Sequence, residues 1–155
     1  AAASPTVVET GDIRYSTTEV LEEGGFGTEA VARLTEFLVG GEARHELERL
    51  TGIALRGDVL VNATRYHRGD FLRAHVDTYD SGVLSLLLYL HQPDWAEGDG
   101  GLLGFQGADG VRDTLPPRHN SMVLLPLRPD LAHCVTTVLR PSFVRSSLIA
   151  HYRAA

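Results

Sequence analysis

The stretch GVLSLLLYLH, residues 82–91, is a short apolar run that begins at a glycine and is followed by the turn residues QPD. Further runs of this β-forming kind, separated by turn residues, occur between residues 53 and 152: DVLVNATRYH, GGLLGFQ, SMVLLPL, HCVTTVL and FVRSSLIAHY. Because no helical periodicity separates them, they predict antiparallel strands in a sandwich or barrel. We expect a jelly roll, the double-stranded β-helix, over about residues 53–152.

The residues before this region show helical spacing instead. Thr28 is a candidate N-cap, and apolar residues follow it at helical intervals up to the pair Gly40–Gly41. The segment EARHELERLTG predicts a second short helix that ends at Gly52. We therefore predict an α+β, mainly β fold, in which a helical layer at about residues 28–51 supports the jelly roll and residues 1–155 form a single domain.

Charge and composition exclude several classes of protein. The net charge of −6 and the lack of a basic tract argue against nucleic-acid binding. Apolar runs such as LLLYL, residues 86–90, are far shorter than the roughly 20 residues that cross a bilayer, so we expect no membrane association. The N-terminal AAASPTVVETGD does not resemble a secretory signal, and a single cysteine, Cys134, is typical of a reducing compartment; we expect a cytoplasmic protein.

Lysine is absent, and all 14 basic side chains are arginine. This composition excludes Schiff-base chemistry by a lysine and a Walker-type phosphate loop. A small anionic ligand would therefore have to be held by arginine, histidine, hydroxyl groups or backbone N–H groups.

The segment RYHRGDFLRAHVDTY, residues 65–79, contains a candidate metal site. If the segment is extended, His75 and Asp77 point to the same face. We expect a third ligand from a distant strand that faces them across the barrel, and His133, at the start of HCVTTVL, suits such a strand. Two histidines and a carboxylate bind Fe(II) with three positions left open, whereas zinc sites more often add a fourth ligand or a water. A His-x-Asp pair without such context also occurs as a surface salt bridge.

The order of several short motifs resembles the Fe(II)- and 2-oxoglutarate-dependent oxygenases, specifically their prolyl 4-hydroxylase-like branch. The resemblance covers about residues 60–152. It rests on these elements, in this order: Tyr66 and Gly69, His75-x-Asp77, YLH at residues 89–91, Gly100–Gly101 with Phe105, Pro117, His133-x-Val135, and Arg145-x-Ser147-Leu148.

The resemblance implies that His75, Asp77 and His133 hold Fe(II), and that 2-oxoglutarate and O2 are co-substrates. It also implies that Arg145 binds the far carboxylate of 2-oxoglutarate, because a buried carboxylate is costly without a cation and a guanidinium binds it bidentately. Arg140 and Arg153 flank the same strand and serve as negative controls.

Three further residues are candidates for co-substrate binding. Ser147 shares the strand face of Arg145, while Tyr66 and Tyr89 match positions where relatives place tyrosines near 2-oxoglutarate. Tyrosines at such positions also serve simply as core packing, with the hydroxyl bonded to the backbone.

The implied reaction hydroxylates or otherwise oxidises an unactivated C–H bond, with release of succinate and CO2. Asp77 favours this chemistry over halogenation, since halogenating relatives replace the carboxylate by a small residue. Prolyl-peptide hydroxylases often carry an arginine where this chain has Gly82, and a tryptophan where it has His151. We therefore expect a small-molecule or amino-acid substrate rather than a protein, with Tyr79 and Trp95 as candidate lid or wall residues on nearby loops.

Other interpretations remain open from the sequence. One is a prolyl hydroxylase that acts on a peptide or protein. Another is a cupin-type metal dioxygenase that does not use 2-oxoglutarate, and a third is a non-enzymatic jelly-roll module. The oligomeric state is not indicated by any of these motifs.

Overall fold

The computed structural model of the chain describes residues 6–10, 13–19, 29–77, 81–107 and 110–154. These residues form two helices, α1 (Glu29–Val39) and α2 (Gly41–Thr51). They also form the strands β1 (Thr6–Thr10), β2 (Ile13–Glu19), β3 (Val59–Tyr66), β4 (Phe71–His75), β5 (Gly82–Tyr89), β6 (Leu103–Gly107), β7 (Gly110–Leu115), β8 (Met122–Pro126), β9 (His133–Val135) and β10 (Arg145–Arg153).

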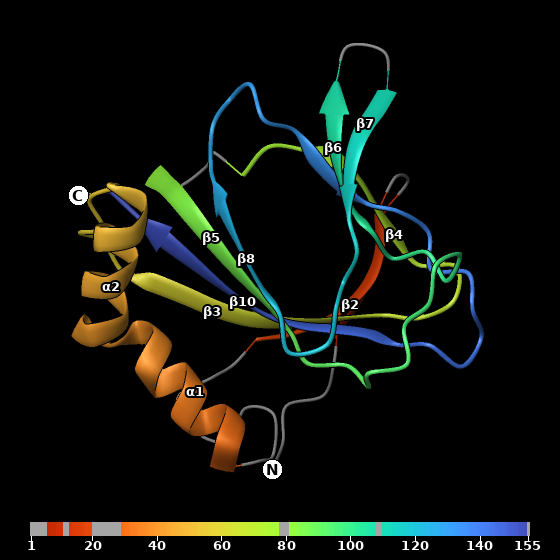
Figure 1. Ribbon diagram of the computed structural model, residues 1–155, viewed down its shortest axis with the longest axis horizontal. Helices are drawn as coiled ribbons and strands as arrows, with labels where there is room; N and C mark the ends of the chain where they lie inside the picture. The colour runs from red at the N-terminus through yellow and green to blue at the C-terminus, as the bar shows by residue number, and fades with distance from the viewer. Residues whose placement is uncertain (1–5, 11–12, 20–28, 78–80, 108–109, 155) are drawn as a thin grey trace.

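All the strands belong to one antiparallel sheet. Its order is β7-β6-β9-β4-β2-β3-β10-β5-β8, and β1 pairs with β2 outside this path. The sheet curls strongly, so that β8 and the β6–β7 hairpin rise on opposite sides of the central strands (Figure 1). A strongly curled antiparallel sheet forms a half-barrel, which is the architecture expected of a jelly roll.

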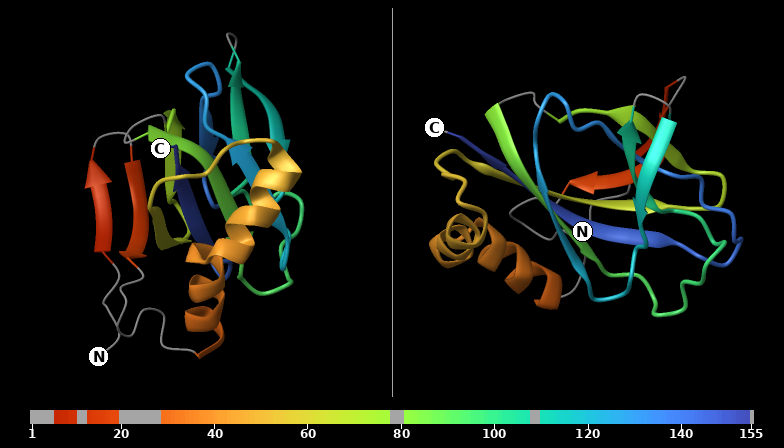
Figure 2. Two further views of the ribbon diagram at one scale, coloured as in Figure 1. Left: turned by 90° about the vertical axis from the view of Figure 1, so that its left-hand side faces the viewer. Right: turned by 45° about the horizontal axis from the view of Figure 1, so that its top comes forward.

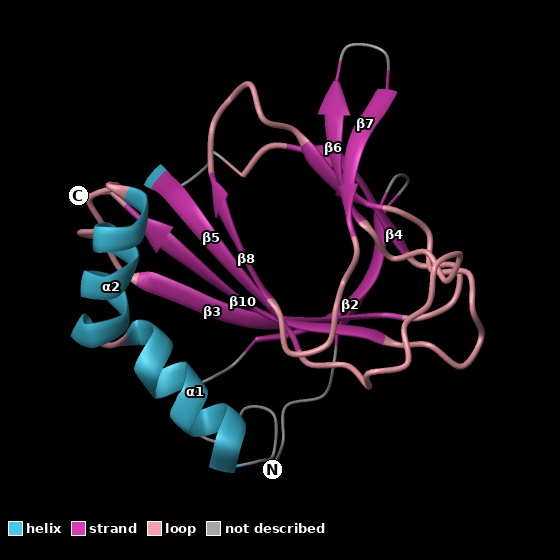
Figure 3. Cartoon of the chain, viewed as in Figure 1, coloured by secondary structure: helices cyan, strands magenta, loops and turns pink. Residues whose placement is uncertain are grey.

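The helices lie together against the outer side of the sheet, on the flank formed by β3, β10 and β5 (Figures 2 and 3). They meet at Gly40, which is the N-cap of α2, and α2 ends at Gly52, whose φ of 71° is left-handed. The predicted helical layer and both of its glycine boundaries are therefore confirmed, while the candidate N-cap Thr28 lies outside the described residues. No helix in the described ranges has the length and apolar character needed to span a bilayer.

Strand β10 is central, with β3 on one side and β5 on the other. Its side chains alternate between two environments, as expected for extended backbone. Leu148, Ala150 and Tyr152 are fully buried in the main hydrophobic core that also includes residues of α1 and α2. The side chains of opposite parity, Arg145, Ile149 and His151, line a cavity on the inner side of the sheet.

Candidate functional site

The cavity inside the curled sheet has a volume of about 350 Å³. Residues of β2 to β6 and of β8 to β10 line it, so nearly the whole sheet contributes. Its lining includes the three predicted metal ligands, His75, Asp77 and His133, together with the predicted co-substrate cation, Arg145. Residues that are up to 70 positions apart in the sequence, from His75 to Arg145, thus share one enclosed space.

The three candidate ligands converge on a single point. Nε2 of His75 lies 3.4 Å from Oδ1 of Asp77, and Nε2 of His133 lies 3.3 Å from Oδ2 of the same carboxylate. One ligand atom from each residue lies within 4.8 Å of the other two. The His133 and Asp77 side chains are only 8% and 11% exposed, whereas His75 is 30% exposed at the rim. All three side chains could therefore bind the same metal ion.

The structure corrects the expected position of His133. We expected it on a strand across the barrel from His75, but β9 pairs directly with β4, and His75 and His133 are partners in the register. Directly opposed residues on neighbouring antiparallel strands project to the same side of the sheet. The two imidazole rings consequently lie with their centroids 4.4 Å apart.

Hydrogen bonds orient this cluster. Nδ1 of His75 lies 2.9 Å from the carbonyl oxygen of Arg73, to which it donates when Nε2 is free to bind a metal. Burial alone would raise the pKa of Asp77, but its hydrogen bonds with His133 and His75 outweigh burial and hold that pKa well below its ordinary value. For His75, burial lowers the pKa, but the hydrogen bonds with Asp77 and with the Arg73 carbonyl and the negative charge of Asp77 together outweigh burial, so the net pKa is raised.

This ligand set is suited to an open metal site. Two imidazoles and one carboxylate offer three ligand atoms within 4.8 Å of one another, and all three residues line the cavity. A metal held there would keep positions free for further ligands, which is the arrangement of non-heme Fe(II) oxygenases.

Arg145 is the second notable feature of the cavity. Its side chain is only 1% exposed, and its guanidinium carbon lies 5.1 Å from the ring centroid of Tyr66 and 5.0 Å from that of Tyr89. Its Nη atoms contact neutral hydroxyls, those of Tyr89 at 3.3 Å and Ser147 at 3.5 Å, and its Nε has no partner. No carboxylate among the described residues forms an ion pair with it. A buried cation of this kind favours an anionic ligand.

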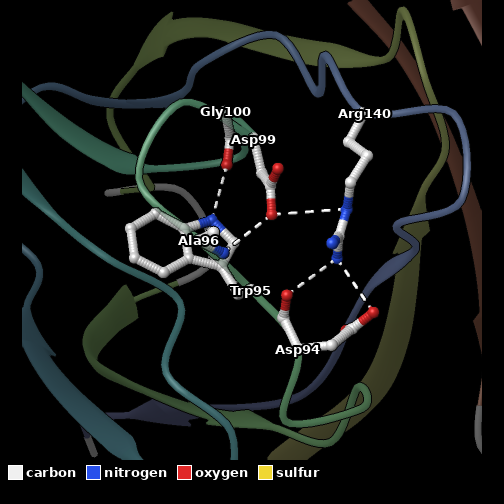
Figure 4. A network of polar contacts seen from close by, with 6 residues as sticks. All are labelled: Asp94, Trp95, Ala96, Asp99, Gly100 and Arg140. Atoms are coloured by element: carbon white, nitrogen blue, oxygen red, sulfur yellow. Dashed lines mark hydrogen bonds and ion pairs between the residues drawn. The ribbon is translucent and has the colours of Figure 1, made fainter.

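The nearby Arg140 shows the opposite situation (Figure 4). Its guanidinium forms ion pairs with Asp94 at 2.9 Å and with Asp99 at 3.4 Å. Its charge is therefore already balanced by side chains of the 94–99 loop, and it does not line the cavity. Arg153, the other control, is likewise absent from the cavity lining.

The same loop fixes Trp95. Its indole Nε1 donates to the carbonyl oxygen of Gly100 at 3.0 Å, as Figure 4 shows, and its ring packs against the cluster around Phe143. Trp95 does not line the cavity, so a role as a substrate wall is not supported. Tyr79, the other aromatic residue considered for such a role, lies outside the described residues.

The remaining candidates divide into two groups. Tyr66 lines the cavity, and burial raises its pKa well above the ordinary value, so it stays a neutral phenol. Tyr89 and Ser147 are fully buried behind the guanidinium of Arg145 and are not part of the lining. Ser147 is in turn bonded to Thr64 through their hydroxyls at 2.7 Å. Tyr89 and Ser147 thus contact the cation rather than the open space.

The glycine pair after the 94–99 loop makes room for these contacts. A Cβ on Gly101 would lie 3.2 Å from Cδ of Arg145, and one on Gly100 would lie 1.9 Å from the carbonyl oxygen of Thr137. Both glycines have positive φ, 72° for Gly100 and 70° for Gly101. The Gly-Gly motif therefore lets the chain pass close to the stem of the buried arginine.

We expect Gly100→Ala to lower the free energy of unfolding by about 2–4 kcal/mol, because it adds a backbone clash to left-handed strain. Denaturant unfolding would measure the change. Gly41→Ala is the matched control, since a Cβ there meets nothing within 4 Å and the residue has ordinary helical surroundings. Equal stability of the two variants would contradict the expectation.

The cavity also contains polar residues that motif analysis did not assign. His151 was noted only as the residue at a position where prolyl-peptide hydroxylases often carry tryptophan, and Asn62 and Ser85 were not singled out. A signal was present for Asn62, because in VNATRY the polar or aromatic residues 62, 64 and 66 alternate with Val61 and Ala63. Ser85 interrupts the apolar run of β5 and is the direct register partner of His151.

Comparison with known proteins identifies relatives of this architecture. The family profile described as the 2OG-Fe(II) oxygenase superfamily matches residues 61–153. A Pseudomonas putida prolyl-4-hydroxylase structure superimposes with a TM-score of 0.72 at 24% identity, covering 92% of this chain and 70% of that one. No curated protein matches the sequence significantly.

Two other solved structures share the fold. A Trichoplax adhaerens prolyl hydroxylase, solved in complex with a hypoxia inducible factor oxygen degradation domain peptide fragment, gives a TM-score of 0.73 at 19% identity, covering 94% of this chain and 66% of that one. A viral collagen prolyl hydroxylase from Paramecium Bursaria Chlorella virus-1, in a 2OG complex, gives 0.66 at 16% identity, with coverage of 93% and 81%. The predicted jelly roll and the predicted family resemblance are confirmed.

Proposed function

Because this chain belongs to the 2OG-Fe(II) oxygenase superfamily, and is thus a 2-oxoglutarate-dependent dioxygenase, we propose that it oxidises an unactivated C–H bond of a small molecule or an amino acid. Bound Fe(II) and 2-oxoglutarate supply the oxidising chemistry, in which one atom of O2 enters the substrate and the other enters succinate, with CO2 as the second product. Family membership sets aside a cupin-type enzyme and a non-enzymatic module.

His75, Asp77 and His133 would hold the Fe(II). This assignment is supported by the convergence of their ligand atoms within 4.8 Å and by the cavity that all three residues line. Donation from Nδ1 of His75 to the carbonyl of Arg73 would orient the ring and leave Nε2 to bind the metal. The low pKa of Asp77 keeps its carboxylate ionised and ready to bind a cation.

Arg145 would bind the far carboxylate of 2-oxoglutarate. The observation that carries the proposal is that this buried guanidinium shares a cavity with the three ligands but has no carboxylate partner among the described residues. Tyr66 would contact the co-substrate from the cavity wall. Tyr89 and Ser147 would hold the guanidinium in place from behind, through their hydroxyls.

The substrate assignment rests on two positions in the sequence, of which only that of His151 lines the cavity. Gly82 offers no side chain where peptide-acting enzymes often place an arginine, and His151 stands where they tend to place a tryptophan. A prolyl hydroxylase acting on a peptide is the second candidate, favoured by similarity to the Trichoplax adhaerens enzyme solved with a peptide fragment. Competition between small amino-acid compounds and prolyl peptides in one turnover assay would distinguish the two.

Anaerobic titration tests the proposed function directly. Adding 2-oxoglutarate to the Fe(II)-loaded protein is expected to produce a weak visible charge-transfer band, because the 2-oxo acid chelates the metal. Admission of O2 should then yield succinate. The same titration without metal is the control. Absence of the band at millimolar 2-oxoglutarate, or 2-oxoglutarate left intact with Fe(II) and O2, would count against the assignment.

A further inference from the structure

Part of the cavity lies beyond the reach expected of the co-substrate. The guanidinium of Arg145 extends to the level of Ser147, where its Nη1 lies 3.5 Å from the hydroxyl. His151 is four residues further along β10, which corresponds to about 13 Å of extended chain. Ser85, Asn62 and His151 line this distant part of the cavity, and the proposed co-substrate contacts do not use them.

Ser85 determines which nitrogen of His151 carries the proton. The two residues are direct partners in the β5–β10 register, and the Ser85 hydroxyl lies 2.7 Å from Nδ1 of His151. Ser85 is only 1% exposed, and Nδ1 is the one acceptor that the described residues offer its hydroxyl. A buried hydroxyl that does not donate is costly, so Ser85 donates to Nδ1. The neutral imidazole then carries its proton on Nε2.

The Nε2–H group of His151 is available to a ligand. No described residue accepts a hydrogen bond from this group. The Nε2 atom is also not fully enclosed, so a ligand can reach it. Because His151 lines the cavity, this N–H group can donate only to a molecule in the cavity or to solvent there. Burial lowers the pKa of His151, which keeps the ring neutral.

Asn62 complements this donor. Its Oδ1 is enclosed and has no partner among the described residues. Asn62 is the register partner of Ile149 on β10, so it lies diagonally from His151 at about 7 Å, a spacing that one small polar group can bridge. Asn62 and His151 both line the cavity, so the carboxamide of Asn62 and the ring N–H of His151 border one space, and neither Oδ1 nor Nε2 has a partner among the described residues.

The cavity wall around this pair is mainly apolar. Leu87, Leu125 and Ile149 provide apolar walls in the same cavity. The charged groups of the lining are those assigned to the metal and to 2-oxoglutarate, and no further acid or arginine lies in it among the described residues. The charges that act on His151 are those of the metal cluster and of Arg153, and a bound metal would balance Asp77. A free ammonium placed here would therefore lose its hydration without gaining an unpaired carboxylate.

We propose that Asn62 and His151, the latter oriented by Ser85, bind an uncharged carbonyl-containing group of the substrate, such as a carboxamide, and so select against a free zwitterion. This narrows the proposed substrates to uncharged small molecules and amino-acid derivatives without free charges. The inference rests on the proposed function, since it concerns the substrate of that reaction. His151 and Asn62 contact substrate in this arrangement, whereas Ser85 is a positioning residue that acts through His151.

The protonation of His151 can be measured without any turnover. Full-length protein with ¹⁵N-labelled histidine, loaded with Zn(II) and 2-oxoglutarate, is expected to show His151 as the Nε2–H tautomer by long-range ¹⁵N–¹H correlation. Ser85→Ala should abolish this preference. A Nδ1–H tautomer, or an imidazolium, in the unsubstituted protein would overturn the proposal.

The substrate class is tested with matched compounds. Free aliphatic amino acids and their N-acetyl carboxamides would be compared in the Fe(II) enzyme by substrate-dependent succinate release. At least one carboxamide is expected to exceed its free amino acid in kcat/KM by roughly tenfold to a hundredfold, the effect of one buried hydrogen bond made or left unmade. Preference for the free amino acids, or no response to any carboxamide, would overturn the assignment.

Substitutions of His151 and Asn62 test whether the preference for carboxamides depends on these two side chains. His151→Leu and Asn62→Leu are each expected to reduce kcat/KM for the best carboxamide by roughly tenfold or more. His151→Gln, which keeps an N–H donor, should recover part of the loss, and His45→Leu on the exposed face of α2 is the control. The dissociation constant for 2-oxoglutarate, read from the charge-transfer band, should change less than about twofold.

The readouts separate two kinds of failure. If the unsubstituted protein shows no charge-transfer band, the proposed function itself is wrong. If the band is normal but His151→Leu weakens 2-oxoglutarate binding and leaves substrate selectivity unchanged, then His151 contacts the co-substrate and this inference alone is overturned.

Discussion

Alanine in place of His75, Asp77 or His133 is expected to abolish 2-oxoglutarate turnover, with a loss on the order of a thousandfold or more. Each substitution removes one of three ligand atoms that lie within 4.8 Å of one another, and the two that remain cannot hold the ion in the same geometry. Succinate release measures the loss of activity. Anaerobic Fe(II) titration measures the accompanying loss of metal affinity.

His45→Ala provides the control for this set. His45 lies on α2, is exposed, and is not part of the cavity lining, so its removal should leave both succinate release and Fe(II) binding unchanged. Full turnover in any of the three ligand variants at the same metal and co-substrate concentrations would refute the assignment of that residue.

Arg145→Ala is expected to raise the KM for 2-oxoglutarate by roughly tenfold to 150-fold. The range corresponds to loss of a charge-assisted hydrogen bond worth roughly 1.5–3 kcal/mol. The guanidinium has no carboxylate partner among the described residues, so its removal leaves no side chain of opposite charge unpaired. Initial rates at varied 2-oxoglutarate would give the KM, and kcat should fall less than KM rises.

Arg140→Ala is the matched arginine control. Arg140 is paired with Asp94 and Asp99, so its loss should weaken the anchoring of the 94–99 loop while leaving the KM for 2-oxoglutarate near that of the unsubstituted protein. An equal rise in KM for the Arg140 and Arg145 variants would show that the effect is general loosening and not loss of a specific contact.

The parts of the fold that were predictable have strong local patterns. The runs at β3, β5, β8 and β10 are rich in apolar and branched residues, and each is a strand in the structure. The helix boundaries at Gly40 and Gly52 follow from the conformational freedom of glycine. In these segments local preference and tertiary burial favour the same structure.

The unpredicted strands lack such a pattern. β7, with the sequence GVRDTL, is exposed along nearly its whole length, so it pairs with β6 through its backbone without burying an apolar face. β1 likewise forms through its pairing with β2. The adjacency of β4 and β9 was also missed, because which strands become neighbours in a curled sheet depends on the path of the loops between them.

The site was partly accessible from the sequence. The motif order placed His75, Asp77, His133 and Arg145 together, and the structure brings all four into one cavity. The division of the other candidates, with Tyr66 in the lining and Tyr89 and Ser147 behind the guanidinium, required coordinates. Strand parity says which face a side chain takes but not how far into a cavity it reaches.

Alternate side chains of β10 point to opposite faces of the sheet and serve two different purposes. Leu148, Ala150 and Tyr152 secure the sheet to the helices, while His151 and Ile149 meet whatever occupies the interior. Substitutions on the second set would alter chemical selectivity and leave the attachment to the helices intact. A protein built this way can be redirected to a new compound one inward side chain at a time, with its scaffold retained.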